Sequence, residues 1–452
     1  MRGGRRSTGT LVAEPGVDPQ YSGWDDPVVA LRDALRHDSQ EVEDHRAAWA
    51  SWLRRRGVDT TWSPRLSIDD PRVGTLVVVE DPYDYAAPLP TVYGGGDTVN
   101  APLMLSCDGA RYWTTRNATV VGGSDFVRTR DGACWPALTP GVESVLVSNA
   151  LDTQLPGWTP SFMIIRDGTP PPRRRILPRS TGRAEHRLDR AIALVGEHSF
   201  QYGHWLLDYL PRSLAVRELP STIPVLVDAD VAPNSLWWLH KVLPDRQIIL
   251  LERGQSIDVS TLFVPLQRTF CPTGWIDSME LTPDVWASDP SGVAQLQTLV
   301  TAGLAVPSKR RRRRLWLGRR GGHRPFVNQQ ELFERMASHG FELVYTEDLS
   351  MPELQSLLNE TQDVIAAEGS QVQNVMACSP GVRVLVLLGD DAASVQGDVA
   401  VYAPALRHEV ALVAGHQVGP LGANPYQRHN RAFVVDPALL DHAHREFFCR
   451  VD

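Results

Sequence analysis

The sequence predicts an α/β protein in which two Rossmann-like domains face a cleft and follow a helical and β-rich N-terminal region. From about residue 190 onwards, short apolar segments alternate with amphipathic segments, which is typical of parallel strands joined by helices. A helical segment near 293–304 divides this pattern into two blocks of about 110 residues each. At roughly 150 residues per domain, the 452-residue chain has room for three units, with expected boundaries at 1–180, 181–305 and 306–452.

The N-terminal unit is expected to be helical first and β-rich afterwards. Apolar residues recur near helical spacing within 26–56, which predicts two amphipathic helices. Alternating runs separated by turn signals then predict a series of strands, at 73–79, 118–121, 144–148 and 162–165. The stretch 168–179 is rich in Pro and Arg and is expected to be a linker.

Both later blocks have the strand–helix alternation of parallel sheets. In the first block we expect helices at 205–219 and 235–242, and strands at 191–194, 223–227, 247–251 and 262–264. In the second we expect helices at 328–339, 350–359 and 370–377, and strands at 315–317, 341–344, 363–366 and 382–388. Ligands of such sheets bind at the carboxyl ends of the strands, so the loops there are the places to search for chemistry.

Composition excludes several classes of protein. With 42% hydrophobic and 22% charged residues, the chain is typical of globular proteins and not of disordered or collagen-like ones. The net charge of −8 argues against a nucleic-acid partner. The five cysteines are dispersed and never form C-x-x-C, so we expect reduced thiols, no zinc site and a cytoplasmic location. The longest apolar run is about seven residues, and a bilayer span needs about 20.

A first candidate site lies in the segment 201–212. His204 and Asp208 are four residues apart and therefore share one face of a helix. A histidine beside a carboxylate can act as a general base with an orienting partner. The alternative interpretation is an ion pair on the helix surface next to a packed Trp205.

A second candidate site is the Gly- and Arg-rich loop that follows the strand expected at 315–317. Arg319, Arg320 and Arg324 offer forked donors that match phosphate oxygens, and Asn328 is expected to cap the next helix. Only Lys241 and Lys309 are lysines among the 45 basic residues. The alternative is therefore a basic loop in an arginine-biased protein.

A third candidate site is the turn between the strand at 363–366 and a helix expected to start at Ser370. Free N–H groups and the dipole at that helix start would favour a diphosphate near Gly369 and Ser370. Glu368 would repel phosphate, so a ligand-facing Glu368 would accept hydrogen bonds from sugar or ribose hydroxyls. The alternative for Glu368 is an acid favoured by the helix dipole. We expect Asn374 to cap its turn.

A run of six basic residues, 309–314, has two interpretations. Like charges repel one another and must be solvated or matched by anions. The run is either an exposed linker between domains or a contact with anionic lipid or an acidic polymer, which would place the protein at the periphery of the inner membrane face.

The three candidate sites, in this order, resemble glycosyltransferase family 61, whose bacterial members are often described as capsular polysaccharide biosynthesis proteins. The resemblance covers roughly residues 190–390. The matching positions are His204, Trp205, Leu206, Asp208, Leu210, Pro211, Arg212, Arg319, Arg320, Arg324, Asn328, Gly369, Asn374, Pro380 and Gly381. The chain departs from the family at Gly318 and within 368–371, where Glu368 stands in place of a frequent histidine.

The resemblance implies a GT-B-like fold and a glycosyltransferase. It further implies inverting transfer, without a metal or a cofactor, from a nucleotide sugar, with a UDP-sugar expected, to a hydroxyl of a glycan or polysaccharide precursor. His204 or Asp208 would be the base. The donor-side residues would be Arg319, Arg320, Arg324, Glu368, Gly369, Ser370 and Asn374. The sugar, the acceptor, the linkage and the oligomeric state stay open.

Two other classes of protein compete with this interpretation. The altered turn 368–371 would also suit a catalytically decayed transferase that binds a glycan or a nucleotide. The basic run 309–314 would also suit an adaptor for anionic surfaces.

Overall fold

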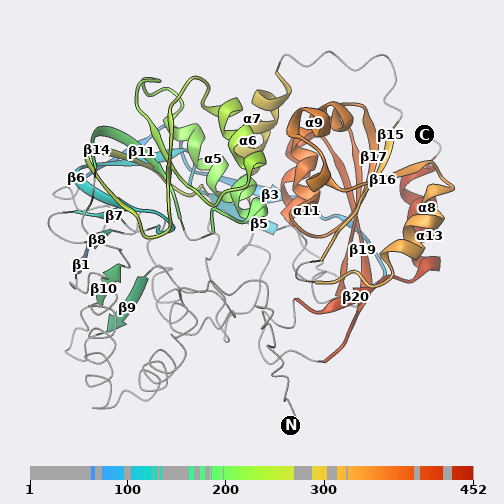
Figure 1. Ribbon diagram of the computed structural model, residues 1–452. Coiled ribbons are helices and arrows are strands. Elements are labelled where there is room, and N and C mark those ends of the chain that lie inside the picture. The colour runs from blue at the N-terminus through green and yellow to red at the C-terminus, as the bar shows by residue number, and fades with distance from the viewer. Residues whose placement is uncertain are drawn as a thin grey trace, which may run out of the picture.

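The protein contains two large β-sheets, and helices packed on each of them meet between the two sheets (Figure 1). The computed structural model describes residues 63–66, 74–95, 103–125, 127–129, 133–134, 162–166, 174–178, 184, 186–196, 198–268, 288–302, 313–321, 324–390, 398–420 and 430–450. The α/β class with parallel sheets is confirmed. The helices expected within 26–56 and the strand expected at 144–148 lie outside the described residues.

The first sheet is built around parallel strands in the order β13–β12–β11–β14. Their bounds are β11 Arg187–Leu194, β12 Val225–Asp228, β13 Ile248–Leu251 and β14 Ser256–Pro265. All of these strands were expected from the sequence. Every residue of β12 is buried, as is typical of a central parallel strand with both faces covered.

The β-rich N-terminal segment extends this sheet, because β14 pairs antiparallel with β6. The further strands of this region are β1 Ser63–Leu66, β2 Thr75–Val78, β6 Arg111–Val121, β7 Val127–Arg128, β8 Ala133–Cys134, β9 Phe162–Arg166 and β10 Arg174–Pro178. The linker expected at 168–179 is wrong in part, since β10 pairs with β9 and β1. Pro178 is the last residue of β10 and lies beyond the residues that pair with β1.

The helix expected at 205–219 is present but changes its pitch. It consists of α4 Tyr202–His204, the π-helical η1 Trp205–Tyr209, α5 Leu210–Arg212 and the 3-10 helix η2 Ser213–Val216. The backbone N–H of Leu210 donates to the carbonyl of Trp205, five residues earlier. Pro211 follows directly and has no N–H to donate, which favours the wider turn before it. The other helix of this block is α6, Pro233–Val242.

The second sheet has the order β16–β15–β17–β18–β19–β20. Its strands are β15 Arg313–Leu317, β16 Phe341–Val344, β17 Thr361–Ala367, β18 Arg383–Gly389, β19 Glu409–Val418 and β20 Ala432–Val434. The pairs from β16 through β19 are parallel, and β20 is antiparallel to β19. The strands expected in this block are confirmed.

Helices cover both faces of the second sheet. α8 Gln329–Ala337 and α13 Pro437–Phe448 lie on the outer face, while α9 Met351–Asn359 and α11 Asp398–Tyr402 lie on the face toward the first block (Figure 1). The 3-10 helices are η4 Thr346–Asp348, η5 Val372–Ala377 and η6 Ala403–Leu406. Neighbouring residues of β15 point to opposite faces: Leu315 packs with α9 and Trp316 packs with α8 and α13.

The expected helix near 293–304 is α7, Pro290–Thr301, and it lies between the two blocks. Its first residue is a proline, and the Asp289 side chain accepts hydrogen bonds from the N–H groups of Ser291 and Gly292. Val293, Leu296 and Val300 on α7 belong to a hydrophobic cluster that contains residues of both blocks. The two sheets therefore share one core through α7.

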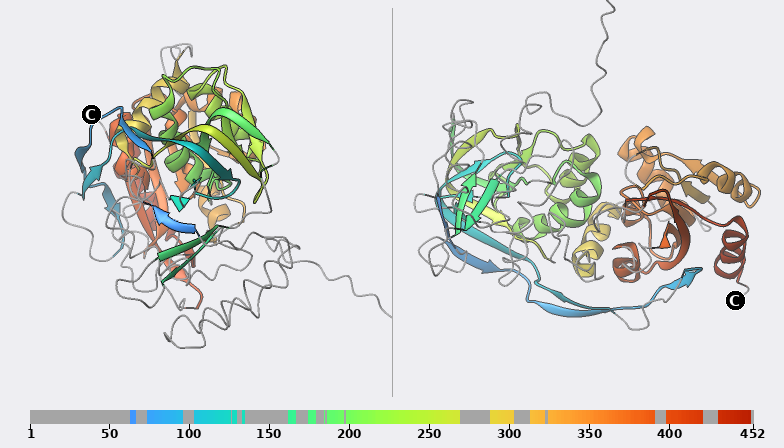
Figure 2. Two further views of the ribbon diagram at one scale, coloured as in Figure 1. Left: turned by 90° about the vertical axis from the view of Figure 1, so that its left-hand side faces the viewer. Right: turned by 90° about the horizontal axis from the view of Figure 1, so that it is seen from below.

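A second connection between the sheets comes from the N-terminal region. β2 pairs with β6 of the first sheet, whereas β4 Thr91–Tyr93 pairs with β19 of the second. Between them, β3 Tyr83–Ala87 and β5 Leu103–Cys107 form a two-stranded ribbon, seen in blue along the lower side of the right-hand view in Figure 2. None of the described helices has the length and apolarity that crossing a bilayer requires.

Candidate active site

Each sheet has a topological switch point, where the chain reverses its direction of travel across the sheet. In the first sheet the chain passes from β11 outward to β12 and β13, and then returns to the other side of β11 as β14. In the second it passes from β15 to β16 and returns to the other side of β15 as β17. The carboxyl ends of the strands at such a point form a crevice that binds ligands. The predicted site residues lie at or just after these strand ends.

At the first switch point the structure brings His204 and Asp208 together, as the sequence predicted. His204 Nδ1 lies 3.8 Å from Asp208 Oδ2. The other carboxylate oxygen, Oδ1, accepts hydrogen bonds from Arg212 Nη2 at 3.0 Å and Gln267 Nε2 at 3.1 Å. The Asp208 side chain is 6% exposed and the His204 side chain 23%. The alternative of a surface ion pair is therefore wrong for Asp208, which lies inside the protein.

The buried Arg212 guanidinium lies against the Asp208 carboxylate. Burial by itself would raise the pKa of Asp208, but the Arg212 guanidinium, assisted by His204, holds this pKa below its usual range. Arg212 is likewise buried, and Asp208, Tyr209 and Asp125 keep its pKa above the usual value. Arg212 Nη1 lies 3.7 Å from Asp125 Oδ1, and the guanidinium lies 4.3 Å from the centre of the Tyr209 ring. The Asp208 side chain therefore favours its ionised, carboxylate form.

Sequence reasoning missed several residues of this network. The His198 ring stacks on the His204 ring with 5.0 Å between centroids, and the Tyr209 hydroxyl donates to Asp125 Oδ1 at 3.4 Å. Gln267 could have been found, because it is a polar residue two positions after the carboxyl end of β14. Asp125 follows β6, an antiparallel strand of the N-terminal region, and no local signal connects it to the helix that it contacts.

Asp228, at the carboxyl end of β12, forms hydrogen bonds with the two loops that carry Asp125 and His198. Its side chain accepts hydrogen bonds from Gly123 N at 2.6 Å, Gly196 N at 2.8 Å and Ser199 Oγ at 2.5 Å. Gly123 precedes Asp125, and the stretch from Gly196 to Ser199 contains His198. Asp228 is fully buried, and burial raises its pKa to about 7, although these three hydrogen bonds oppose the rise.

This raised pKa predicts an unusual pH dependence of stability. Between the unfolded pKa near 4 and the folded pKa of about 7, the folded state binds more protons than the unfolded state. The contribution of Asp228 to the free energy of unfolding is therefore highest below pH 4, falls as pH rises to about 7, and is constant above. The slope is at most about 1.4 kcal/mol per pH unit.

Urea unfolding between pH 4 and 8 of wild type and Asp228→Asn checks this expectation. The difference in unfolding free energy between the two proteins should decrease across this window, because the variant has no proton to lose. A difference that does not change with pH would contradict it.

At the second switch point a cavity of about 350 Å³ opens between the two blocks. It brings together four predicted donor-side residues, namely Arg319, Arg320, Ser370 and Asn374. Its remaining walls are Tyr202, Ala232, Asn234, Gly318, Gly321, Thr346, Glu347, Leu354 and Gln371. Tyr202, Ala232 and Asn234 belong to the first block, so both halves of the protein form this cavity.

Arg319 is held in the cavity wall by its neighbours. Its backbone N–H donates to Gln329 Oε1 at 2.7 Å, and its Nη1 donates to the Glu368 carbonyl at 2.6 Å. Burial, and next the positive charge of Arg324, lower the pKa of Arg319 to about 10. An anion in the cavity would offset both effects, because it would neutralise a cation that has lost part of its hydration.

Arg320 has a different environment from Arg319. Its guanidinium is half exposed, forms an ion pair with Asp348 at 2.5 Å, and lies 3.7 Å from the centre of the Tyr345 ring. Arg320 lines the mouth of the cavity, and a ligand there would have to compete with Asp348 for this side chain.

The structure places Arg324, Glu368 and Gly369 outside the lining of this cavity. Arg324 Nη1 and Glu368 Oε2 form an ion pair at 2.6 Å. A Cβ on Gly369, whose φ is +150°, would lie 2.8 Å from Gln371 Oε1 and 3.2 Å from Arg319 Nη1, so glycine lets Arg319 approach the turn. Donor contacts by these three residues remain predictions.

The helix expected to start at Ser370 is wrong in its type and its start. The turn leads into the six-residue 3-10 helix η5, which begins at Val372. The N–H groups of residues 372–374 already donate to the carbonyls of residues 369–371, so the dipole argument for a diphosphate is weaker than expected. Asn374 does cap the turn, since its Nδ2 donates to the Gln371 carbonyl at 3.0 Å.

The two switch points meet at Gly203 and Ser370. A Cβ on Gly203 would lie 2.9 Å from Ser370 Oγ, so the helix that carries His204 lies directly against the turn of the second block. Close by, the Tyr202 hydroxyl donates to Asn374 Oδ1 at 2.8 Å. The His204–Asp208 pair and the cavity are thus adjacent parts of one interface between the blocks.

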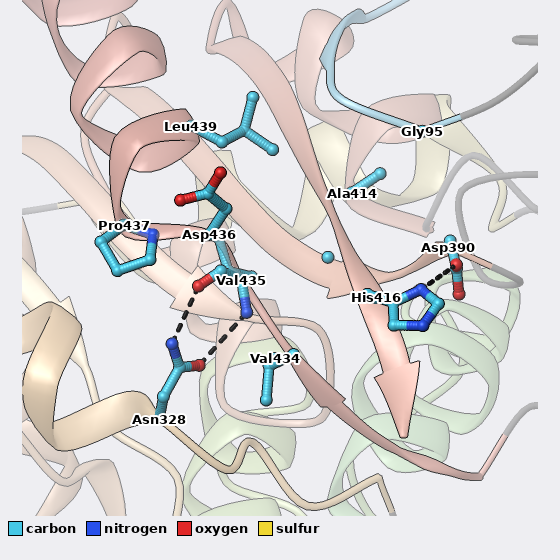
Figure 3. A pocket seen from close by; sticks show the side chains of 11 residues that line it. Gly95, Asn328, Asp390, Ala414, His416, Val434, Val435, Asp436, Pro437 and Leu439 are labelled. Atoms are coloured by element: carbon cyan, nitrogen blue, oxygen red, sulfur yellow. Dashed lines mark hydrogen bonds and ion pairs between the residues drawn. The ribbon is translucent and has the colours of Figure 1, made fainter. Parts of the chain in front are cut away.

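Another cavity, of about 440 Å³, lies at the carboxyl ends of β18 and β19 (Figure 3). Asn328 lines it, and the residue has the expected N-cap position of α8. Its side chain makes no capping bond there: Nδ2 donates to the Val435 carbonyl at 2.8 Å, and Val435 N donates to Oδ1 at 3.2 Å. Asn328 therefore connects the start of α8 to the segment between β20 and α13. The expected N-cap position is confirmed, but the side chain makes no capping hydrogen bond.

The basic run is described at its last two residues, because 309–312 lie outside the described part of the chain. Arg313 forms ion pairs with Glu342 and Glu360, and Arg314 forms one with Asp363. These two cations are matched within the protein. A contact of this run with an anionic membrane stays a prediction.

Residues 202–385 match the model of the family described as Glycosyltransferase 61. This segment of the chain belongs to glycosyltransferase family 61. It begins at the first residue of α4 and ends within β18, so it contains the His204–Asp208 pair, the three strands of the second switch point and every residue that lines the cavity.

The family predicted from the three motifs is confirmed, and the protein is a glycosyltransferase. A comparison with curated proteins finds no match to the chain. Within the described residues, no group of three His, Cys, Asp or Glu side chains is placed to hold a metal ion. The bacterial and capsular associations of the family resemblance remain predictions.

Proposed function

We propose that this glycosyltransferase uses a GT-B-like arrangement to move a sugar from a UDP-sugar to a hydroxyl of a glycan or polysaccharide precursor, with inversion and without a metal. One observation carries the proposal: a buried His–Asp pair on one sheet lies next to an arginine-lined cavity on the other, and the two meet where Gly203 contacts Ser370. Such an interface between two α/β blocks can hold a donor on one side and an acceptor on the other.

The cavity suits the diphosphate of a nucleotide sugar. Arg319 supplies a partly desolvated cation, and Ser370 supplies a hydroxyl in the same cavity. Fixed positive charge at the leaving group is the usual substitute for a metal in glycosyl transfer, because negative charge develops on the departing phosphate oxygen. The proposal of metal independence rests on this cation.

His204 is the stronger candidate for the base. Asp208 uses Oδ1 to accept from Arg212 and Gln267, and its lowered pKa makes it a weak proton acceptor. The imidazole is the more exposed partner, and a carboxylate near Nδ1 favours the tautomer that carries a proton there. The other ring nitrogen, Nε2, can then accept the proton of an acceptor hydroxyl.

The transfer conserves atoms and charge as follows. The acceptor oxygen forms a bond to the anomeric carbon on the face opposite the leaving group, and its proton passes to His204 Nε2. The bond between that carbon and the diphosphate oxygen breaks, and its electron pair remains on the diphosphate beside Arg319. Asp208 orients the ring and stabilises the imidazolium that results.

A thermal-shift panel of UDP-, GDP-, CMP- and dTDP-sugars tests this function. A ligand at 100 times its dissociation constant stabilises the folded state by about 2.7 kcal/mol, so a shift with the uridine-linked sugars is expected. Shifts confined to another nucleotide would overturn the uridine donor, and no shift with any of them would overturn the nucleotide-sugar site.

The decayed transferase is not favoured by the family match. Slow hydrolysis of the stabilising donor without an acceptor, followed by release of the nucleoside diphosphate, is expected of an active enzyme. A protein that binds the donor but never cleaves it, with or without glycan acceptors, would restore that alternative.

A further inference from the structure

Tyr202 connects the helix that carries the base to the turn that lines the donor cavity. The residue is the first of α4, two positions before His204. Its hydroxyl reaches across to the second block, where it donates to Asn374 Oδ1 at 2.8 Å and lies 3.8 Å from Met351 Sδ. The same oxygen accepts a hydrogen bond from Trp238 Nε1 at 2.9 Å, within the first block.

Both ends of this cross-block hydrogen bond are well anchored. Asn374 and Trp238 are fully buried, and Asn374 Nδ2 is held by the Gln371 carbonyl at 3.0 Å. Neither end can move alone without leaving a buried polar atom unpaired, which is unfavourable. The contact therefore transmits displacement from one block to the other.

The bond is also placed where a ligand would touch both of its ends. Tyr202 and Asn374 both line the 350 Å³ cavity, together with Ser370 and Gln371 of the same turn. On the base side, Gly203 lies against Ser370, and no side chain separates α4 from the turn there. Occupancy of the cavity thus acts on the start of the helix that carries His204.

We propose that Tyr202 is a positioning residue that couples donor occupancy of the cavity to the placement of His204. The proposal rests on the function proposed above. A donor that orders the turn from Ser370 to Asn374 also orders α4 and η1 through the tyrosine hydroxyl. By linkage, the helix in its ordered position strengthens donor binding by the same factor.

Hydrogen–deuterium exchange of the full chain, with UDP as the probe, tests this coupling. In wild type, UDP should slow amide exchange in two segments, namely 370–377 in the second block and 203–212 in the first. The slowing in 203–212 should be about fivefold or more, the lower end of typical coupling between sites. In Tyr202→Phe, UDP should still protect 370–377 but no longer protect 203–212.

Trp238→Phe is the matched control, because it removes a hydrogen bond to the same hydroxyl without breaking the bond to Asn374. It should keep the UDP-induced protection of 203–212. Protection of 203–212 that persists in Tyr202→Phe, or is missing in wild type that binds UDP, would overturn the coupling.

Ligand-free exchange separates this inference from the proposed donor. Without any ligand, Tyr202→Phe should speed exchange in both 203–212 and 370–377, whereas Trp238→Phe should speed it in the first block alone. If calorimetry shows that wild type does not bind UDP, the uridine donor is overturned. The ligand-free comparison then tests the coupling between the blocks. Faster exchange of both segments in Tyr202→Phe supports the coupling, and faster exchange confined to 203–212 in that variant overturns it.

Discussion

Replacing His204 with Gln is expected to lower kcat for sugar transfer by about 10²- to 10⁴-fold, the usual contribution of a general base. Donor affinity should change little, because His204 does not line the donor cavity. Asp208→Asn should also reduce kcat, since the neutral amide cannot stabilise an imidazolium at 3.8 Å. Initial-rate kinetics with the donor found by thermal shift, together with calorimetry of UDP binding, separate the two effects.

A second His–Asp pair of the chain supplies the matched control for these variants. His416 Nδ1 lies 3.2 Å from Asp390 Oδ2 beside the cavity of about 440 Å³, and neither residue lines the cavity that contains Arg319 (Figure 3). His416→Gln and Asp390→Asn should leave kcat unchanged. Full turnover in His204→Gln with loss in Asp208→Asn would make Asp208 the base, and full turnover in both would remove the pair from the mechanism.

Arg319→Ala is expected to weaken UDP binding by about 1.5–3 kcal/mol, a loss of about 10- to 150-fold in affinity. The loss should be large because Arg319 is partly buried in the cavity wall, where burial lowers its pKa. A phosphate there would form a charge-assisted hydrogen bond with the guanidinium and stabilise its charged form. Isothermal titration calorimetry with UDP measures it. Arg319→Lys should recover part of the affinity, since the charge is kept and the forked geometry is lost.

Two exposed arginines test whether the effect belongs to the cavity. Arg320→Ala should cost less affinity, because Arg320 is already paired with Asp348 and exposed to solvent. Arg335 lies on α8, where it forms an ion pair with Asp441 of α13. Arg335→Ala should have no effect on UDP binding. Unchanged UDP binding in both Arg319→Ala and Arg320→Ala would refute the idea that this loop holds the diphosphate.

Local patterns in the sequence were sufficient for most of the α/β elements. The strands around 192, 225, 315 and 385 were predictable, because apolar residues follow one another in short runs bounded by polar turns. The spacing of His204 and Asp208 likewise predicted their contact, since residues four apart meet whether the local turn is α or π. These features depend on neighbours along the chain.

Errors arose where distant residues determine the local structure. The segment from Arg174 to Pro178 is a strand because β9 and β1 supply its hydrogen-bond partners, which its proline-rich surroundings conceal. The Asn328 side chain bonds to Val435, over a hundred residues away, in place of capping its own helix. Arg324 and Glu368 are paired with each other, which no spacing argument could foresee.

The sequence by itself determined the α/β class, the glycosyltransferase family and the His204–Asp208 pair, because helical periodicity and short motifs are local properties of the chain. Only the tertiary structure decided that Asp208 is buried between Arg212 and Gln267, that Arg319 and not Arg324 lines the cavity, and that Tyr202 spans the two blocks. Burial and partner choice depend on which sheet ends face each other. That arrangement follows from the packing of α7 between the two blocks and from the N-terminal strands β2 and β4, which pair with one sheet each.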